Sequence, residues 1–302
     1  MSILLKNREE GKIIENMTHD DLKSLDEKKT FIELFNTDRL RQLIIGPSGC
    51  GKTHLVISLI RQALIPFTKI IVCAPKPTLE EWTWKGLKIF FDSIETKIKE
   101  ESDDEDYESD EEDHDDEEND EDEEPDPIMT LKSLEEIDSV EDLSIKEAYL
   151  YIVDDFMTMS TEAKKRLLDL WVRGSKRKLH LIFLCQKANA RSIPPALRDS
   201  CNVWTLFNGI GLHDFEMVCH SYFPMLDGQP MVELRKLLLS GRRNYVTLLK
   251  NEDDREKKIM MNGDKYFIIR EIDDHEDQSY TSPDKETNEK PDEKGQGEQR
   301  HL

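Results

Sequence analysis

The sequence predicts an α/β fold in which a mainly parallel β-sheet is flanked by helices. A glycine-rich loop at residues 46–53 separates an apolar segment of strand length from a segment with helical periodicity. Further apolar segments of strand length alternate with helical patterns over residues 69–207. These segments are nearly continuously apolar, which is typical of parallel strands buried between two layers of helices.

The glycine-rich loop reads Gly-Pro-Ser-Gly-Cys-Gly-Lys-Thr and matches the whole G-x-x-x-x-G-K-[ST] pattern. A predicted strand at residues 40–45 precedes it and a predicted helix at 54–64 follows, which is the context of a phosphate-binding loop. Backbone N–H groups at such a helix N-terminus bind anions. We expect Lys52 to reach the β- and γ-phosphates of ATP and the Thr53 hydroxyl to bind Mg²⁺. The nucleotide-binding residues expected from the loop are Gly46, Pro47, Ser48, Gly49, Cys50, Gly51, Lys52, Thr53 and His54.

The other elements follow from apolar periodicity and from turn residues. The predicted strands lie at residues 69–74, 148–153, 179–185, 202–207, 243–249 and 265–270. The last two are predicted to be closing strands that pair as a hairpin. The predicted helices lie at residues 79–91, 161–172, 192–198, 213–222 and 231–239, and residues 30–35 form a short strand or helix. Ser160 or Thr161 is expected to cap the second of these helices.

The net charge of −23 is concentrated in two segments. Residues 100–124 contain 20 Asp and Glu with no Lys or Arg, and residues 271–302 carry a net charge of −7. Subtracting the charges of both segments from the total leaves a net charge of +4 for the rest of the chain, which is compatible with a nucleic-acid partner. Self-repulsion and the lack of apolar residues predict disorder in the acidic segments. The expected organisation is a polar lead-in at 1–29, an ATPase domain at 30–270 with a disordered acidic insertion at 98–130, and a disordered tail at 271–302.

Two carboxylates follow the predicted strand at residues 148–153. An apolar strand that ends in acidic residues is the expected second part of a P-loop ATPase site, because one carboxylate must hold Mg²⁺ beside Thr53. We assign that role to Asp154. Asp155 would then orient the attacking water and act as a base. The competing interpretation is a solvated pair at a strand end.

Gln186 ends the predicted strand at residues 179–185. In additional-strand P-loop ATPases, the strand between the P-loop strand and the acidic strand ends in such a polar group. A glutamine amide can donate to the γ-phosphate and also hold the attacking water. The sequence therefore predicts an additional-strand P-loop NTPase with Gln186 as a catalytic residue.

The order of these motifs resembles the genome-packaging ATPases of large double-stranded DNA viruses, virophages and Polinton-like elements. This is the poxvirus-type branch of the FtsK–HerA superfamily. The residues that carry the resemblance are Gly-Pro-Ser-Gly-Cys-Gly-Lys-Thr at 46–53, Tyr-Ile-Val-Asp-Asp at 151–155, His-Leu-Ile-Phe-Leu-Cys-Gln at 180–186 and Ile-Pro-Pro-Ala-Leu-Arg at 193–198. The resemblance covers about residues 30–250 without the acidic insertion. Many members have Asp-Glu where this chain has Asp154-Asp155, and the shorter Asp155 reaches less far.

The resemblance implies a ring, a pentamer or hexamer, that pumps double-stranded DNA into a capsid through a portal vertex. It also implies an arginine that acts on the ATP of the neighbouring subunit, for which the candidates are Arg173, Arg177 and Arg198. Basic residues that would line a DNA channel are Lys85, Lys88, Arg235, Lys236, Arg242 and Arg243.

Other classes of function remain as alternatives. A P-loop nucleotide or nucleoside kinase would transfer phosphate to an acceptor, and an ATP-dependent helicase or AAA-type remodeller would share the same loop. The five cysteines form no C-x-x-C pair, which indicates a reducing compartment. The sequence contains no signal peptide or apolar run of membrane length. The expected location is the host cytoplasm, a viral factory or the virion, with no membrane contact.

Overall fold

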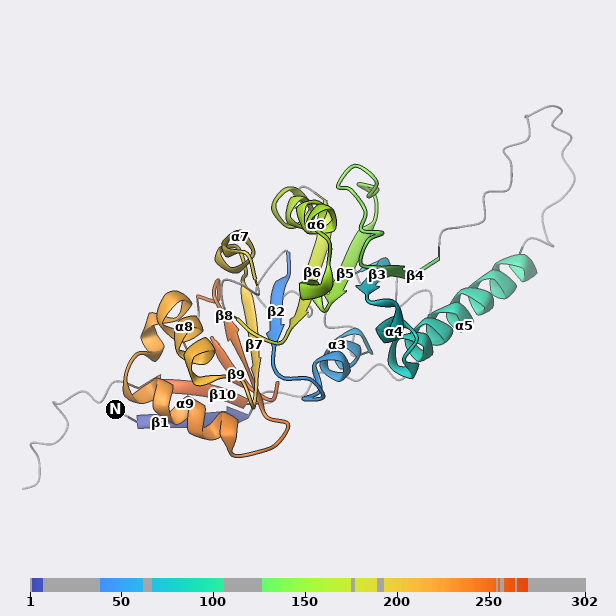
Figure 1. Cartoon of the computed structure of the whole chain (residues 1–302). Helices are drawn as coiled ribbons and strands as arrows, with labels where there is room; N and C mark the ends of the chain where they lie inside the picture. The colour runs from blue at the N-terminus through green and yellow to red at the C-terminus, as the bar shows by residue number, and fades with distance from the viewer. Residues whose placement is uncertain are drawn as a thin grey trace, which may run out of the picture.

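A computed structural model gives the structure of the chain. It describes residues 2–7, 39–61, 67–105, 127–174, 177–188, 193–253, 255, 258–263 and 265–270. Within these ranges a single sheet runs through the molecule, with helices on both of its faces (Figure 1). None of the described helices is long and apolar enough to cross a bilayer.

The sheet has ten strands in the described part of the chain, in the order β1-β10-β9-β8-β7-β2-β6-β5-β3-β4. The six strands from β7 to β4 are parallel, and the other four join them in antiparallel pairs. The parallel strands are β2 (Arg41–Ile45), β3 (Lys69–Ala74), β4 (Met129–Ser133), β5 (Ala148–Asp154), β6 (Lys178–Cys185) and β7 (Val203–Phe207). The antiparallel strands are β1 (Ser2–Asn7), β8 (Tyr245–Leu249), β9 (Ile259–Met261) and β10 (Lys265–Arg270).

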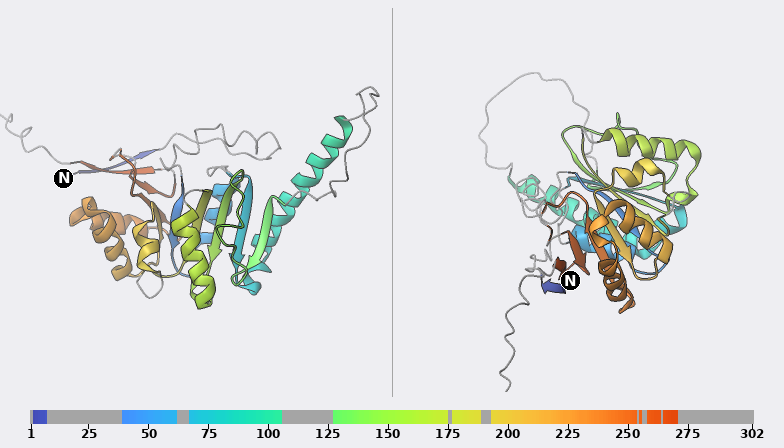
Figure 2. Two further views of the ribbon diagram at one scale, coloured as in Figure 1. Left: turned by 90° about the horizontal axis from the view of Figure 1, so that it is seen from above. Right: turned by 90° about the vertical axis from the view of Figure 1, so that its left-hand side faces the viewer.

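Helices cover the two faces of the parallel strands (Figures 1 and 2). One face packs on α3 (Lys52–Arg61) and α5 (Trp82–Glu105), and α4 (Lys76–Leu79) precedes α5. The other face packs on α6 (Thr161–Arg173), α7 (Pro195–Asp199), α8 (Leu212–Tyr222) and α9 (Gln229–Leu239). Ser160 caps α6 by accepting a hydrogen bond at 3.2 Å from the Ala163 N–H, as its position predicts.

The topology confirms the predicted additional strand. β6 lies between β2, which leads into the glycine-rich loop, and β5, which ends in Asp154. Because β2, β6 and β5 are parallel, their carboxyl ends meet at one edge of the sheet. We call this the carboxyl edge, and the opposite side the amino edge.

The structure corrects several of the sequence-based predictions. Ser2–Asn7 is a strand paired with β10, so the segment expected to be a polar lead-in contributes to the sheet. α5 continues to Glu105 and β4 begins at Met129, both inside the expected insertion at 98–130. The two closing strands form no hairpin, because β9 lies between them. The other residues of the lead-in, the segment 30–35, residues 106–126 and the tail from 271 lie outside the described residues.

Candidate functional site

The glycine-rich loop connects β2 to α3, which begins at Lys52. Gly49 and Gly51 have φ values of +73° and +111°, a region that side chains rarely adopt. Gly46 has no space for a side chain, since a Cβ there would lie 2.6 Å from Phe207 Cβ and 2.7 Å from Cys50 Sγ. The loop therefore needs glycine for two different reasons, backbone conformation and close packing.

The side chain of Lys52 folds back over its own loop. Its Nζ donates hydrogen bonds to the carbonyl oxygens of Gly46 at 2.9 Å and Pro47 at 3.0 Å. These contacts hold the ammonium group above the loop, where a phosphate bound to the loop amides would meet it.

A pocket of about 670 Å³ opens beside this loop at the carboxyl edge of the sheet. It brings together the residues of the loop from Ser48 to His54, both strand-end carboxylates and Gln186. Gly46 and Pro47 do not line it. The pocket lining is Ser48, Gly49, Cys50, Gly51, Lys52, Thr53, His54, Leu55, Ser58, Thr78, Glu81, Thr83, Asp154, Asp155, Leu184, Gln186, Phe207, Arg243 and Tyr245. Groups predicted from three separate segments of sequence therefore share one cavity.

Asp154 is the last residue of β5 and is half-buried. Burial raises its pKa to about 6, while the charge of Lys52 opposes the shift and the charge of Asp155 adds to it. Near neutral pH the group is therefore mostly a carboxylate beside a lysine. A cation bound beside Thr53 would favour the charged form of Asp154 further.

Asp155 has an unusual backbone conformation. Its φ of 60° and ψ of 49° lie in the left-handed region, where aspartate is tolerated better than most residues. Its carbonyl oxygen accepts hydrogen bonds from the N–H of Thr158 at 3.2 Å and from the Thr158 hydroxyl at 3.0 Å. The turn that follows β5 thus fixes two adjacent carboxylates at the pocket.

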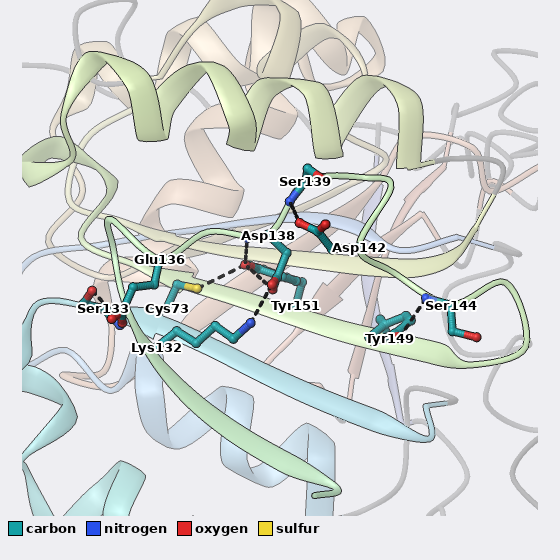
Figure 3. A network of polar contacts seen from close by, with 10 residues as sticks. All are labelled: Cys73, Lys132, Ser133, Glu136, Asp138, Ser139, Asp142, Ser144, Tyr149 and Tyr151. Atoms are coloured by element: carbon teal, nitrogen blue, oxygen red, sulfur yellow. Dashed lines mark hydrogen bonds and ion pairs between the residues drawn. The ribbon is translucent and has the colours of Figure 1, made fainter. Parts of the chain in front are cut away.

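A polar network holds the strand that carries these carboxylates (Figure 3). The hydroxyl of Tyr151 on β5 accepts from the Cys73 thiol at 3.3 Å and from the Asp138 N–H at 3.2 Å, and it donates to the Asp138 carboxylate at 3.2 Å. Lys132 forms an ion pair with the same carboxylate at 2.5 Å. Burial raises the pKa of the Cys73 thiol to about 12, so the thiol stays protonated. The network ties β3, β4 and the segment after β4 to β5.

Oxygen ligands suited to Mg²⁺ are present in the pocket. Thr53 contributes a hydroxyl and Asp154 a carboxylate, the donor types that Mg²⁺ binds together with water and substrate phosphates. No group of three or more His, Cys, Asp or Glu side chains that could hold a metal occurs among the described residues. The donor set therefore fits a cation held jointly with a nucleotide.

The three candidate arginines do not line the pocket. Arg173 ends α6 and pairs with Asp169 at 3.0 Å and also with Glu141. Arg177 precedes β6, and Arg198 lies on α7 with its Nη1 3.6 Å from Met217 Sδ. All three precede a parallel strand and so lie toward the amino edge of the sheet. A strand of five to eight residues separates them from the pocket, about 16–27 Å at about 3.3 Å for each residue.

The structure adds pocket residues that sequence reasoning did not assign to the nucleotide site. Thr78, Glu81 and Thr83 follow β3, and Phe207, Arg243 and Tyr245 come from β7 and the start of β8. The Phe207 and Tyr245 rings lie 5.2 Å apart with an interplanar angle of 35°. Glu81 lies seven residues after the predicted strand at 69–74, so its position gives a weaker signal than those of Asp154 and Gln186, which directly follow their strands. Nothing local in the sequence distinguishes the others.

The family model described as "Type III restriction enzyme, res subunit" matches residues 14–169, more than half of the sequence. The chain belongs to this family. Its phosphate-binding loop, its additional-strand sheet and its family identify it as a P-loop ATPase. No curated protein matches the sequence.

Solved structures with low sequence identity also match the model. The genome packaging NTPase B204 from Sulfolobus turreted icosahedral virus 2, in complex with ATP-gammaS, is 10% identical with a TM-score of 0.37, over 74% of this chain and 97% of that chain. The DNA-packaging ATPase B204 from Sulfolobus turreted icosahedral virus is 13% identical with a TM-score of 0.43, over 75% and 97%. The pCW3 conjugation coupling protein TcpA is 10% identical with a TM-score of 0.36, over 75% and 60%.

Proposed function

We propose that this protein hydrolyses ATP with water as the acceptor and uses the reaction to move double-stranded DNA, packaging a viral genome into a capsid. The observation that carries the hydrolytic part is the single pocket that joins Lys52, Asp154 and Gln186. A kinase directs its phosphate to a bound hydroxyl, whereas these groups suit the activation of water. The DNA-moving part rests on the motif resemblance and on the family.

Five residues of the pocket have a proposed role in hydrolysis. Lys52 leaves the carbonyls of Gly46 and Pro47 to contact the β- and γ-phosphates. Thr53 and Asp154 hold Mg²⁺, which when bound neutralises charge on the phosphates. Gln186 holds the γ-phosphate and the attacking water, and Asp155 orients that water.

The far wall of the pocket is proposed to bind the nucleoside. Asp154 and Gln186 come from β5 and β6, on one side of the P-loop strand, whereas Phe207 and Tyr245 come from β7 and β8 on the other. A γ-phosphate near the acidic groups directs the rest of ATP toward this second side. Stacking of a base on an aromatic side chain there is favourable by about 1–3 kcal/mol. Arg243 adds a cation to the same wall.

The transition-state arginine is proposed to come from a neighbouring subunit in a ring. Arg173, Arg177 and Arg198 lie a strand length from the pocket of their own chain, so they act only in trans. Arg173 would have to leave Asp169 and Glu141 on assembly. A mixed-ring assay identifies the residue: subunits with Arg173→Ala or Arg177→Ala are combined with Lys52→Ala subunits. Restored hydrolysis supports trans action, and no restoration with any candidate contradicts it.

The basic residues proposed to contact DNA differ in their surroundings. Lys88 pairs with Asp92 and Lys236 with Glu233, both at 2.8 Å, while the Arg235 guanidinium lies over the Phe215 ring. Lys85, Arg242 and Arg243 are exposed. Lys85 and Arg242 are therefore the better candidates for contacts with DNA phosphates, since Arg243 lines the nucleotide pocket. Gripping of phosphates would make DNA binding strongly dependent on salt.

An ATPase assay with and without DNA tests the proposal. Phosphate release from ATP without any acceptor, increased by duplex DNA, is the expected result. Release only in the presence of a nucleoside or nucleotide acceptor would indicate a kinase. Hydrolysis that neither duplex DNA nor self-assembly affects would indicate a kinase or remodeller and contradict the motor. Triplex displacement along duplex DNA then distinguishes translocation from strand separation.

A further inference from the structure

The segment that follows a third parallel strand, β3, contributes a carboxylate to the pocket. β3 lies next to β5 in the sheet, and the chain after β3 passes through α4 to reach Glu81, the residue before α5. Glu81 lines the same cavity as Lys52, Asp154 and Gln186. Three adjacent parallel strands, β6, β5 and β3, thus each direct a polar group to one site.

The backbone around Glu81 is well fixed. Its N–H donates to the Thr78 carbonyl oxygen at 3.2 Å, and its own carbonyl oxygen accepts from the Lys85 N–H at 3.2 Å. Pro75 and Pro77 restrict the turn that precedes it. The carboxylate has no hydrogen bond or ion pair within the described part of the chain, and its charge acts on Asp154. The side chain is therefore held at the pocket by its backbone and is available to a ligand.

We propose that Glu81 is the carboxylate that binds and activates the attacking water. The proposal rests on the proposed ATP hydrolysis and assigns a residue to it. Water oxygen forms a bond to the γ-phosphorus, the bond from that phosphorus to the β–γ bridging oxygen breaks, and ADP leaves. Glu81 accepts the proton that water loses, and inorganic phosphate is released.

Two features of the pocket favour Glu81 over Asp155 for this role. Asp155 has a side chain shorter by one methylene, and its left-handed backbone fixes where that side chain begins. Asp154, its neighbour, is committed to the cation. Glu81 approaches from the turn between α4 and α5 with a longer side chain, so it can contact water without displacing Asp154.

Glu80 offers a matched control. It precedes Glu81, is exposed as Glu81 is, carries the same charge and, unlike Glu81, does not line the pocket. Glu81→Gln should lower kcat by at least about 100-fold while the affinity for a non-hydrolysable ATP analogue changes by less than about threefold. Glu80→Gln should change kcat by less than about twofold.

The experiment uses the full chain with ATP and Mg²⁺, and it separates the proposal from the function on which it rests. If the unmodified protein does not hydrolyse ATP, the proposed function fails. A second outcome is that the unmodified protein hydrolyses ATP, that Lys52→Ala is inactive and that Glu81→Gln keeps more than about a third of kcat. In that case only the proposed role of Glu81 fails. Recovery of Glu81→Gln turnover at raised Mg²⁺ would also overturn the role, because it would make Glu81 a cation ligand. Glu81→Asp, which keeps the charge, should recover part of the activity.

Discussion

Replacing Asp154 by asparagine tests whether the nucleotide pocket lowers the stability of the fold. Burial raises the pKa of this carboxyl from 3.8 to about 6, and the charge of Lys52 only partly opposes the shift. The folded protein then binds the Asp154 proton more tightly than the unfolded chain does. Its stability therefore falls as the pH rises from about 4 to about 6, and the loss is complete above about pH 7.

The size of this loss follows from the two pKa values. The difference between 3.8 and about 6, at about 1.4 kcal/mol for each pKa unit, gives at most about 3 kcal/mol at pH 8 and about half of that at pH 5. Asparagine has nearly the same size and stays neutral. Asp154→Asn should therefore stabilise the nucleotide-free protein by up to about 3 kcal/mol at pH 8, and by less at pH 5.

Urea unfolding in EDTA at the two pH values measures the effect. Asp253→Asn, at an exposed position after β8, is the control and should leave the stability unchanged at both. Asp154→Asn should also lose Mg²⁺-dependent hydrolysis, so the substitution would raise the stability and lower the activity. An equal gain at pH 5 and pH 8, or a loss of stability at pH 8, would refute the reasoning.

Three further predictions concern packing, capping and the nucleoside wall. Gly46→Ala should destabilise the protein by about 1–3 kcal/mol in urea unfolding, because its Cβ would overlap Phe207. Gly86→Ala within α5, whose Cβ would lie no closer than 3.5 Å to Trp82, should not destabilise it. Equal losses of stability would contradict the packing argument. Ser160→Ala should cost about 1 kcal/mol through loss of the α6 cap, measured in the same way, and an unchanged midpoint would mean that the cap contributes nothing. Tyr245→Ala should raise the KM for ATP by about tenfold or more with little change in kcat, while Tyr245→Phe keeps the stacking surface and the KM. An unchanged KM in Tyr245→Ala would exclude this wall as the nucleoside site.

Much of the core of the fold could be predicted because its signals are local. Short stretches of sequence are enough to recognise the loop glycines, the apolar strands and the polar residue that follows a strand. The pocket brings together Lys52, Asp154 and Gln186, as these local signals predicted. The roles assigned to these residues stay predictions, as does the arginine that acts in trans.

The parts that could not be predicted depend on pairing between distant segments. β1 is a short segment within the predicted lead-in, and its partner, β10, lies more than two hundred residues away. β9 is only three residues long. Arg41 is a further example. It is a charged residue in a buried strand, and the neighbouring sequence does not indicate which groups its side chain binds. Its guanidinium donates to the carbonyl oxygens of Trp171, at the end of α6, and Leu179. Burial lowers its pKa to about 10, still well above neutrality.

The hydrolysis of ATP by Lys52→Ala, compared with the unmodified protein, tests the central claim most directly. Lys52 is the cation of the loop and shares the pocket with the carboxylates. Released phosphate is measured with Mg²⁺, with duplex DNA and without an acceptor, and circular dichroism checks that the variant is folded. We expect the unmodified protein to release phosphate and Lys52→Ala to lose at least about 100-fold of that rate. Unchanged turnover in a folded Lys52→Ala variant would contradict the account, because hydrolysis would then occur outside this pocket.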